Sequence, residues 1–296
     1  MESRNEAKPD DIPPIRWPLE RVKQFEIRQD DLFLLTYPKS GTHWLMEIIP
    51  LVLNGRDTEA AIPLEKKGLL LEMVLAKDGD DPRVLFLKKN HGIPDDFDVS
   101  QIESPRFLAS HIKYDNLPKQ LFEKKTKVIY LARNPKDVAV SLLNQIARPP
   151  INAPDDLSLF LTTSFFTDKD KGGSGEWGVH VSKWWKQKDE DHVLFLKYED
   201  LRKDMKTGIQ AIAKFLGKDL SFETVTKIAD HCTIDNMKEI SKDDPVLKAM
   251  GWKDNPFVRK GKVGGWKERF TVAQSEMMDK YCEKWLTGTG LEFDLQ

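Results

Sequence analysis

The stretch Leu32-Phe-Leu-Leu-Thr-Tyr37, Pro38-Lys-Ser-Gly-Thr-His-Trp44, Leu45-Met-Glu-Ile-Ile49 decides the fold. A short apolar run, a tight turn and an apolar helical pattern in this order predict a buried strand that leads directly into a helix. Backbone N–H groups at such a helix start bind anions, with Gly41 allowing close approach and Lys39 adding charge. The turn is therefore a candidate phosphate site, although taken alone it is also compatible with an ordinary strand-to-helix connection.

Three further apolar runs, residues 107–112, 127–132 and 193–198, each lead into a helix-like stretch. Strands interleaved with helices predict right-handed crossovers and a parallel sheet, whose ligands bind beyond the carboxyl ends of the strands. We therefore expect a single α/β domain over residues 19–296, with a parallel sheet flanked by helices in an architecture like that of P-loop nucleotide-binding proteins. Residues 1–18 are charged and Pro-rich and are expected to form an N-terminal arm.

The composition limits the possible partners. The 296 residues carry 46 Lys plus Arg against 48 Asp plus Glu, so no global basic charge attracts nucleic acid or an anionic membrane. Cys232 and Cys282 lack the spacing of a disulfide framework or a zinc site, which favours a reducing compartment. The N-terminus is polar and no apolar stretch is long enough to span a bilayer. We expect a cytoplasmic protein without a nucleic-acid or membrane partner.

Two other segments are candidates for anion binding. Arg133 follows the run 127–132 and precedes a helix that carries Ser141, and an Arg at a strand end can bind phosphate through two nitrogens. Phe257-Val-Arg-Lys-Gly-Lys-Val-Gly-Gly-Trp266 places three basic residues beside three glycines. Each segment alone is also typical of a solvated basic surface. Together with the first turn, they suggest a nucleotide phosphorylated at two separate positions.

Four ordered motifs carry a family resemblance. They are Tyr37-Pro-Lys-Ser-Gly-Thr42, Arg133-Asn-Pro-Lys-Asp-Val-Ala-Val-Ser141, Tyr198-Glu-Asp-Leu201 and Arg259-Lys-Gly-Lys-Val-Gly-Gly-Trp266. Over roughly residues 25–290 the chain resembles the cytosolic sulfotransferases. The resemblance implies an enzyme that transfers a sulfonate group from 3′-phosphoadenosine-5′-phosphosulfate (PAPS) to a hydroxyl or amine of a small organic acceptor. It also implies release of the desulfonated product PAP, and no requirement for a metal.

The resemblance further implies which residues bind the cofactor. Residues 39–44 would hold the 5′-phosphosulfate end, with Trp44 stacking on adenine, while Arg133, Ser141 and residues 259–261 would hold the 3′-phosphate. Tyr198 would reach the adenine. The full implied set is Lys39, Ser40, Gly41, Thr42, His43, Trp44, Arg133, Ser141, Tyr198, Cys232, Ile234, Met237, Arg259, Lys260 and Gly261.

The chain departs from the family pattern at several of these positions. His43 stands where a second Thr is usual, so an imidazole would replace a hydroxyl beside the phosphate. In the segment His231-Cys-Thr-Ile-Asp-Asn-Met237, Cys232 and Ile234 replace the usual Thr and Phe. Loss of the aromatic partner would weaken stacking on adenine by on the order of 1 kcal/mol. Ala109 stands where some members carry Lys, and none of these changes removes the core of the site.

Sulfonate transfer requires a group that takes the acceptor proton and a positive charge near the departing phosphate oxygen. His111 ends the apolar run 107–111, and by the resemblance it occupies the position of the general base. Lys39 is the natural partner for the leaving phosphate. A strand-end His can also be an ordinary core residue.

Two other functions remain open at this point. A small-molecule kinase would share the sheet and the phosphate turn, but the spacing GxxxxGK[ST] is missing. A sulfotransferase-like binding protein without activity is conceivable because of His43, Cys232 and Ile234. The presence of both Lys39 and His111 argues against it.

The acceptor and the oligomeric state are also expectations from the resemblance. The acceptor walls would come from residues 69–96, 142–155 and 238–257. Leu142-Leu-Asn-Gln-Ile-Ala147 is aliphatic and polar, which favours alicyclic or aliphatic alcohols as well as phenols. Lys267-Glu-Arg-Phe-Thr-Val-Ala-Gln-Ser-Glu276 matches the dimerisation segment of the family and predicts a homodimer.

Overall fold

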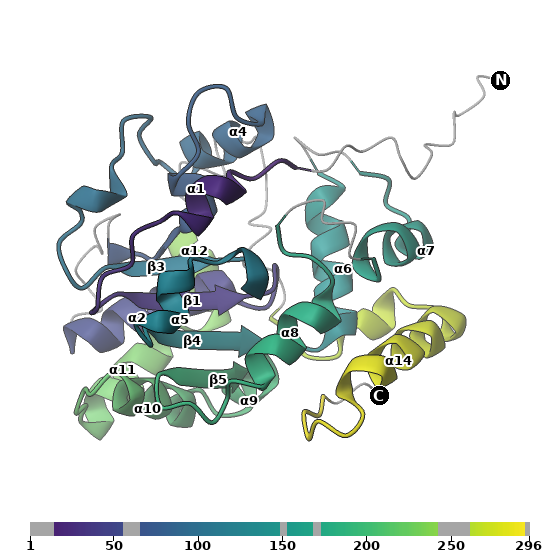
Figure 1. Cartoon of the computed structure of the whole chain (residues 1–296). Helices are drawn as coiled ribbons and strands as arrows, with labels where there is room; N and C mark the ends of the chain where they lie inside the picture. Colours follow the sequence, from purple (N-terminus) through teal and green to yellow (C-terminus); the bar gives the residue numbers. More distant parts are fainter. Residues whose placement is uncertain (1–14, 56–65, 149–152, 168–172, 242–260, 294–296) are drawn as a thin grey trace.

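A parallel β-sheet forms the centre of the protein. The computed structural model describes residues 15–55, 66–148, 153–167, 173–241 and 261–293. In these ranges the sheet has five strands in the order β2-β3-β1-β4-β5, and every neighbouring pair is parallel (Figure 1). The strands are β1 (Leu32–Thr36), β2 (Leu69–Leu70), β3 (Phe107–Ser110), β4 (Lys127–Ala132) and β5 (Val193–Lys197). The predicted α/β fold with a parallel sheet flanked by helices is confirmed.

Helices and short helical turns fill the connections. The helices are α1 (Leu19–Lys23), α2 (Thr42–Asn54), α3 (Leu71–Val74), α4 (Pro82–Asn90), α5 (Lys119–Glu123), α6 (Pro135–Ile146), α7 (Leu157–Phe160), α8 (Trp177–Trp185), α9 (Tyr198–Lys203), α10 (Met205–Phe215), α11 (Phe222–His231), α12 (Ile234–Ser241) and α14 (Val272–Leu286). Shorter turns lie at Val99–Gln101, Tyr114–Asn116, Leu161–Phe165 and Gly265–Glu268. β2 and β5 lead directly into α3 and α9, whereas the other three strands lead into a helix through a short connection or a longer loop.

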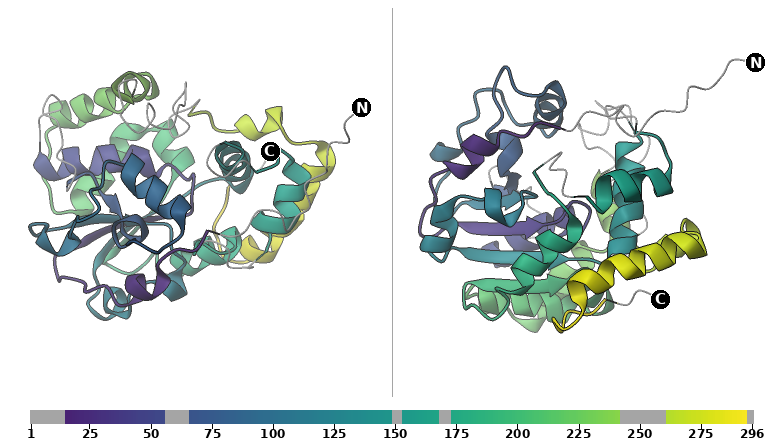
Figure 2. Two further views of the ribbon diagram at one scale, coloured as in Figure 1. Left: turned by 90° about the horizontal axis from the view of Figure 1, so that it is seen from above. Right: turned by 45° about the vertical axis from the view of Figure 1, so that its right-hand side comes forward.

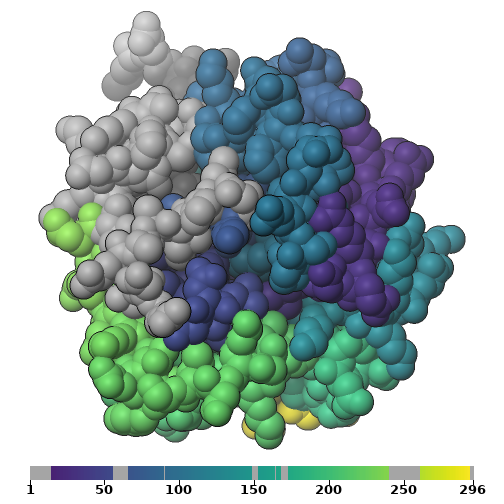
Figure 3. Space-filling model, turned by 90° about the vertical axis from the view of Figure 1, so that its left-hand side faces the viewer, coloured from purple at the N-terminus to yellow at the C-terminus, as the bar shows by residue number. Residues whose placement is uncertain are grey.

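The helices that cover the sheet pack in groups, and members of one group can lie far apart in the sequence. Helices α2, α10 and α11 contact one another, and Figure 3 shows the blue-violet surface of α2 bordered by the green residues of α10 and α11. Helix α14, yellow in Figure 2, contacts α6 and α8. In Figure 1 the arrows of β1 and β4 point toward the side where α6 and α14 lie. The carboxyl ends of the strands therefore face the helices that follow Arg133 and precede the C-terminus.

Three strands end earlier than the apolar runs predicted. β1 ends at Thr36, β3 at Ser110 and β5 at Lys197, so Tyr37, His111 and Tyr198 lie just beyond the sheet. The reason is clear for β3, because the backbone N–H of His111 donates to a side chain, Glu72 Oε1, at 2.9 Å. β2 was not predicted, since two residues are too few to show a periodic pattern.

A buried ion pair fixes the opposite, amino-terminal edge of the sheet. Asp31 precedes β1 and Arg106 precedes β3, and the guanidinium donates to both carboxylate oxygens at 2.8 and 2.6 Å. The Asp31 side chain is completely buried, and the Arg106 carbonyl accepts the N–H of Leu32 at 2.9 Å. This pair aligns β1 with β3 far from the strand ends that carry the candidate site.

The described end of the N-terminal segment lies against the domain. Pro18 is buried, Trp17 packs on the core, and the N–H of Arg16 donates to Asp81 at 3.0 Å. Residues 1–14 lie outside the described residues, so the boundary at residue 18 stays a prediction. In the part of the chain that the structure describes, no helix is long and apolar enough to cross a membrane.

Candidate functional site

The predicted site residues follow the carboxyl ends of neighbouring strands. The turn 37–41 follows β1, His111 follows β3, Arg133 follows β4 and Tyr198 follows β5. Because the strands are parallel, these ends meet at one edge of the sheet, where ligands of open α/β sheets bind. β1 lies between β3 and β4, so the turn lies between His111 on one side and Arg133 on the other.

The turn after β1 has the backbone of an anion site. Lys39 has a φ of 70° and Gly41 a φ of 112°, and α2 begins at the next residue. A side chain at position 41 would also come within 2.8 Å of the Tyr198 ring. Gly41 provides no side-chain cap, and the buried Ser40 hydroxyl has no hydrogen-bond partner among the described residues. An uncapped helix start with a buried, partnerless hydroxyl fits a phosphate group.

The guanidinium of Arg133 connects its own motif to the other three. It donates to the carbonyl oxygen of Lys39 at 3.1 Å and to that of Lys262 at 3.4 Å, and it lies 4.3 Å from the ring centre of Tyr198. Its Nε has no partner within the described residues. The structure therefore brings together basic segments that lie about a hundred residues apart in the sequence, and it leaves a buried donor at their junction.

Asp137 positions the glycine-rich segment. It lies in the first turn of α6, and its carboxylate accepts the N–H groups of Gly264 and Trp266, each at 2.9 Å. The sequence analysis missed this role, although Asp137 stands inside the motif that begins at Arg133. Arg259 and Lys260 lie outside the described residues. Gly261 is described, with a φ of 57°.

The residues implied for adenine binding lie close together. Trp44 is buried, its indole N–H donates to the Cys232 carbonyl at 2.9 Å, and its ring meets Tyr198 edge-on at 5.4 Å. A side chain at Gly261 would come within 2.5 Å of Ile234, so the glycine-rich segment touches the segment that contains Cys232. Burial raises the pKa of the Cys232 thiol, which therefore stays neutral.

Two further residues of the cofactor-binding set implied by the resemblance lie on helices, and their side chains are largely buried. Met237 lies on α12, close in sequence to Cys232 and Ile234, and Ser141 lies on α6 one turn beyond Asp137. Ser141 thus shares a helix with the residue that holds the glycine-rich segment.

The imidazole of His111 is held in one tautomer. Its Nδ1 lies 3.0 Å from both the carbonyl oxygen and the hydroxyl oxygen of Thr36. A carbonyl oxygen only accepts, so Nδ1 carries the proton and Nε2 keeps its lone pair. The Thr36 hydroxyl also lies 2.7 Å from that of Thr42, at the start of α2. Two hydroxyls therefore connect the imidazole to the phosphate turn, a link that the sequence analysis did not predict.

The surroundings keep His111 neutral near pH 7. Burial lowers its pKa, Glu72 and the Thr36 carbonyl act in the opposite direction, and Lys39 lowers it further. A neutral imidazole with an available Nε2 can accept a proton, as a general base must. Glu72 is a second residue that the sequence analysis missed, because it stands in the apolar run 69–75 and meets His111 only through the fold.

His43 lies in the first turn of α2, beside the phosphate turn. Its ring centre is 6.3 Å from that of His91. Burial, followed by His91, Lys39 and His111, holds the pKa of His43 well below its usual value. His43 therefore adds no positive charge for a phosphate and can only donate an N–H to it. The described residues contain no group of three or more His, Cys, Asp or Glu side chains placed to hold a metal ion.

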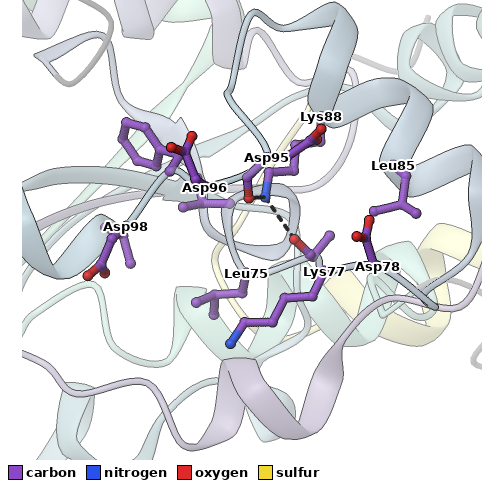
Figure 4. Close-up of a pocket in the computed structure, with 12 residues that line it drawn as sticks. Leu75, Lys77, Asp78, Leu85, Lys88, Asp95, Asp96 and Asp98 are labelled. Atoms are coloured by element: carbon purple, nitrogen blue, oxygen red, sulfur yellow. Dashed lines mark hydrogen bonds between the residues drawn. The ribbon is translucent and has the colours of Figure 1, made fainter.

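A cavity of about 580 Å³ lies between the end of α3, α4 and residues 95–99 (Figure 4), and all but the last three of its lining residues fall in the range 69–96 predicted to form an acceptor wall. The ammonium group of the buried Lys88 donates to the Ala76 carbonyl at 2.8 Å. Four carboxylates line the cavity, from Asp78, Asp95, Asp96 and Asp98. Their negative charge disfavours a doubly phosphorylated nucleotide in this cavity.

Comparisons with known proteins agree with this geometry. The family model described as the sulfotransferase domain matches residues 29–290. Sulfotransferase 1B1 of Canis lupus familiaris is 36% identical over 286 residues, which cover 93% of this chain and 89% of the relative. The amine sulfotransferase of Oryctolagus cuniculus is 36% identical over 284 residues, which cover 93% of this chain and 87% of the relative.

Solved structures show the same similarity. The crystal structure of mouse sulfotransferase SULT7A1 complexed with PAP matches with a TM-score of 0.70 and 30% identity, covering 91% of this chain and 88% of that one. Retinol dehydratase in complex with androsterone and PAP matches with a TM-score of 0.78 at 24% identity, covering 93% of this chain and 86% of that one. The second likeness shows the shared fold alone.

Proposed function

This chain belongs to the sulfotransferase family, and we propose that it transfers sulfonate from PAPS to a hydroxyl or amine of a small organic acceptor, with His111 as general base. One observation carries the proposal. The Thr36 and Thr42 hydroxyls link Nδ1 of the His111 imidazole to the phosphate turn, and with the proton on Nδ1 the Nε2 nitrogen keeps its lone pair. A proton acceptor beside an anion cradle is what transfer from a phosphosulfate to an alcohol requires.

The residues present suit PAPS at three points. The uncapped start of α2 would bind the 5′ end together with Lys39, His43 and the Ser40 hydroxyl, which has no partner in the described part of the chain. Arg133, whose Nε has no partner among the described residues, would bind the 3′-phosphate together with Ser141 and residues 259–261. The adenine would lie among Trp44, Tyr198, Cys232, Ile234 and Met237.

Two residues then act directly in the transfer. As the acceptor oxygen forms its bond to sulfur, its proton passes to His111 Nε2. The bond between sulfur and the bridging phosphate oxygen breaks, and its electron pair stays on that oxygen, where the ammonium group of Lys39 offsets the developing charge. The base and the cationic group therefore follow two adjacent strands, β3 and β1.

The acceptor is proposed to be an alicyclic or aliphatic alcohol as well as a phenol. The end of α6 that follows Ser141 carries Leu142, Leu143 and Ile146, and all three pack into or against the apolar core. Aliphatic walls surround a saturated ring as well as a flat one, whereas aromatic walls favour stacking on a phenol.

Ligand-induced thermal stabilisation separates a sulfotransferase from a small-molecule kinase. We expect PAP to raise the melting temperature, by an amount that grows with concentration, because it binds only the folded state. ATP should raise it much less, since its triphosphate extends from the 5′ position and it offers nothing to the 3′-phosphate residues. The measurement is a melting curve at equal concentrations of PAP and ATP. A larger shift with ATP would support the kinase and contradict this proposal.

We also propose a homodimer formed through residues 267–276. Val272, the first residue of α14, is 76% exposed, and Thr271 and Gln274 cap this helix start reciprocally. An exposed apolar side chain at a capped helix start can form a small contact between two copies of the chain. So short a segment buries much less than the roughly 1,200 to 2,000 Å² of a standard interface, so the dimer should depend on concentration.

Val272→Glu should shift the protein toward monomer, because it places a charge in the proposed contact. Light scattering over a concentration series measures this shift. Phe222→Glu is the matched control, since Phe222 is also the first residue of a helix and is 70% exposed, but lies outside the segment. A wild-type protein that remains monomeric at the highest concentration would contradict the dimer.

A reducing compartment is consistent with the two thiols. Cys232 and Cys282 are both free and buried, and burial raises the pKa of each thiol. Neutral, inaccessible thiols do not form disulfides. We therefore propose that the protein functions in the cytoplasm.

A further inference from the structure

We propose that Glu72 is a positioning residue for the general base: its carboxylate fixes His111 beyond the end of β3 and supplies the negative charge that favours proton uptake by the imidazole. The inference deepens the proposed function and rests on the role assigned there to His111.

Glu72 accepts two hydrogen bonds at the end of β3, one from His111 and one from the residue before it. One carboxylate oxygen accepts the backbone N–H of His111 at 2.9 Å, and the other accepts the Ser110 hydroxyl at 2.8 Å. The Ser110 oxygen in turn accepts the N–H of Ile112 at 3.0 Å. One carboxylate therefore holds the three consecutive residues at which β3 ends, and it determines where the His111 side chain begins.

The position of Glu72 is itself fixed. It lies on α3, is only 1% exposed, and its neighbours Leu71 and Met73 are buried in the core. Removing a carboxylate from water costs several kcal/mol unless it gains compensating partners. Among the described residues Glu72 has two hydrogen-bond partners, both uncharged, whereas the buried Asp31 is paired with an arginine. A neutral glutamine could hold the same backbone at a lower desolvation cost, so the charge itself calls for a functional reason.

The electrostatic surroundings of His111 provide that reason. The titratable side chains that face it in the described structure come from four elements: Glu72 from α3, Lys39 from the β1–α2 turn, His43 from α2 and His180 from α8. Glu72 is the anion in this set. Burial and Lys39 lower the pKa of His111, whereas Glu72 raises it. Without Glu72, the imidazole would be a weaker base, because the negative charge that offsets the effect of Lys39 would be lost, and the reaction also needs the positive charge of Lys39.

The critical variant is Glu72→Gln, which keeps the shape and removes the charge. Two measurements are made on the full-length protein: the pH profile of kcat/KM with PAPS, and the NMR titration of isotope-labelled histidines in the PAP complex. Protonated His111 cannot act as a base, so activity falls as pH drops through its pKa. We expect this acid limb, and the His111 titration, to move to lower pH by roughly one unit. kcat on the plateau should fall about tenfold because the base is weaker, while PAP affinity changes little.

Asp31→Asn is the matched control. Asp31 is an equally buried carboxylate at the opposite end of β1, and its loss should lower the melting temperature without moving the acid limb. A structural role for Glu72 would produce this same result in Glu72→Gln. An unchanged acid limb and an unchanged His111 titration in Glu72→Gln would therefore overturn the inference.

Ser110→Ala is a second variant, which keeps the proposal testable if Glu72→Gln does not fold. It leaves the negative charge of Glu72 in place but removes the hydroxyl that donates to this carboxylate and offsets its charge. The pKa of His111 in the NMR titration should therefore rise, and an unchanged or lower pKa would count against the inference. The role of His111 as general base is tested separately. It would be contradicted if the activity of the wild-type enzyme did not fall at the pH where His111 titrates. In that case the NMR titration still tests the electrostatic coupling between Glu72 and His111.

Discussion

His111→Ala is expected to lower kcat by about 10² to 10⁴ while PAP still binds. The reason is that proton uptake and phosphate binding are assigned to different residues. The imidazole contacts Thr36 and is proposed to receive the acceptor proton, whereas the phosphates are assigned to the start of α2, to Arg133 and to residues 259–261. Steady-state kinetics and a PAP binding isotherm on the same preparation measure both quantities.

His192→Ala is the control for this variant. His192 is also half-buried and precedes a strand, but it lies beside Glu190 at the amino-terminal end of β5, away from the site. Its replacement should leave kcat unchanged. A folded His111→Ala protein that binds PAP and turns over within a few-fold of the wild type would refute the assignment of the base.

The pH dependence of the wild type follows from the same group. Burial holds the pKa of His111 below the usual value of 6.5. The base is therefore active at neutral pH, and the rate should fall only as the pH drops below 6.5.

Lys39→Ala should affect both binding and rate, with kcat/KM falling by about 10² to 10³ or more. The ammonium group would meet a phosphate in the ground state and a more negative oxygen in the transition state, so the affinity for PAP and kcat should both decline. Kinetics in PAPS and a PAP isotherm separate the two losses, and a variant with normal PAP affinity would contradict this role.

Lys39→Met separates the charge from the backbone. Residue 39 has a positive φ, which is strained for any side chain, so Ala and Met keep the same strain as Lys. Met also keeps most of the side-chain length. We expect Lys39→Met to be as impaired as Lys39→Ala, whereas Lys214→Ala, at an exposed position in the last turn of α10, should behave like the wild type.

The elements that depend on a local sequence pattern could be predicted from the sequence. The apolar runs identified four strands, and the turn after β1 was predicted as a helix start. The two-residue β2 was missed because it has no periodicity. The ends of β1, β3 and β5 were placed one or two residues too late, since apolar character continues past the point where backbone pairing stops.

The parts of the site that could not be predicted depend on contacts between distant residues. Glu72 meets His111 across 39 positions, and Asp137 meets Trp266 across 129. Neither carboxylate differs in its local sequence from an ordinary helix residue. The tautomer of His111 is likewise set by the Thr36 carbonyl, on the neighbouring strand. Arg259 and Lys260 lie outside the described residues, so their role stays a prediction.

The most direct test of the account is sulfonate transfer by the purified protein. It is incubated with PAPS and, separately, with simple phenols, hydroxysteroids, bile alcohols and arylamines, and the products are identified by mass spectrometry. We expect a sulfonated product and equimolar PAP with at least one phenol and one alicyclic alcohol, without added metal, and none above background with His111→Ala. Stabilisation by PAP with no sulfonated product from any acceptor in the panel would contradict the account and indicate a binding protein.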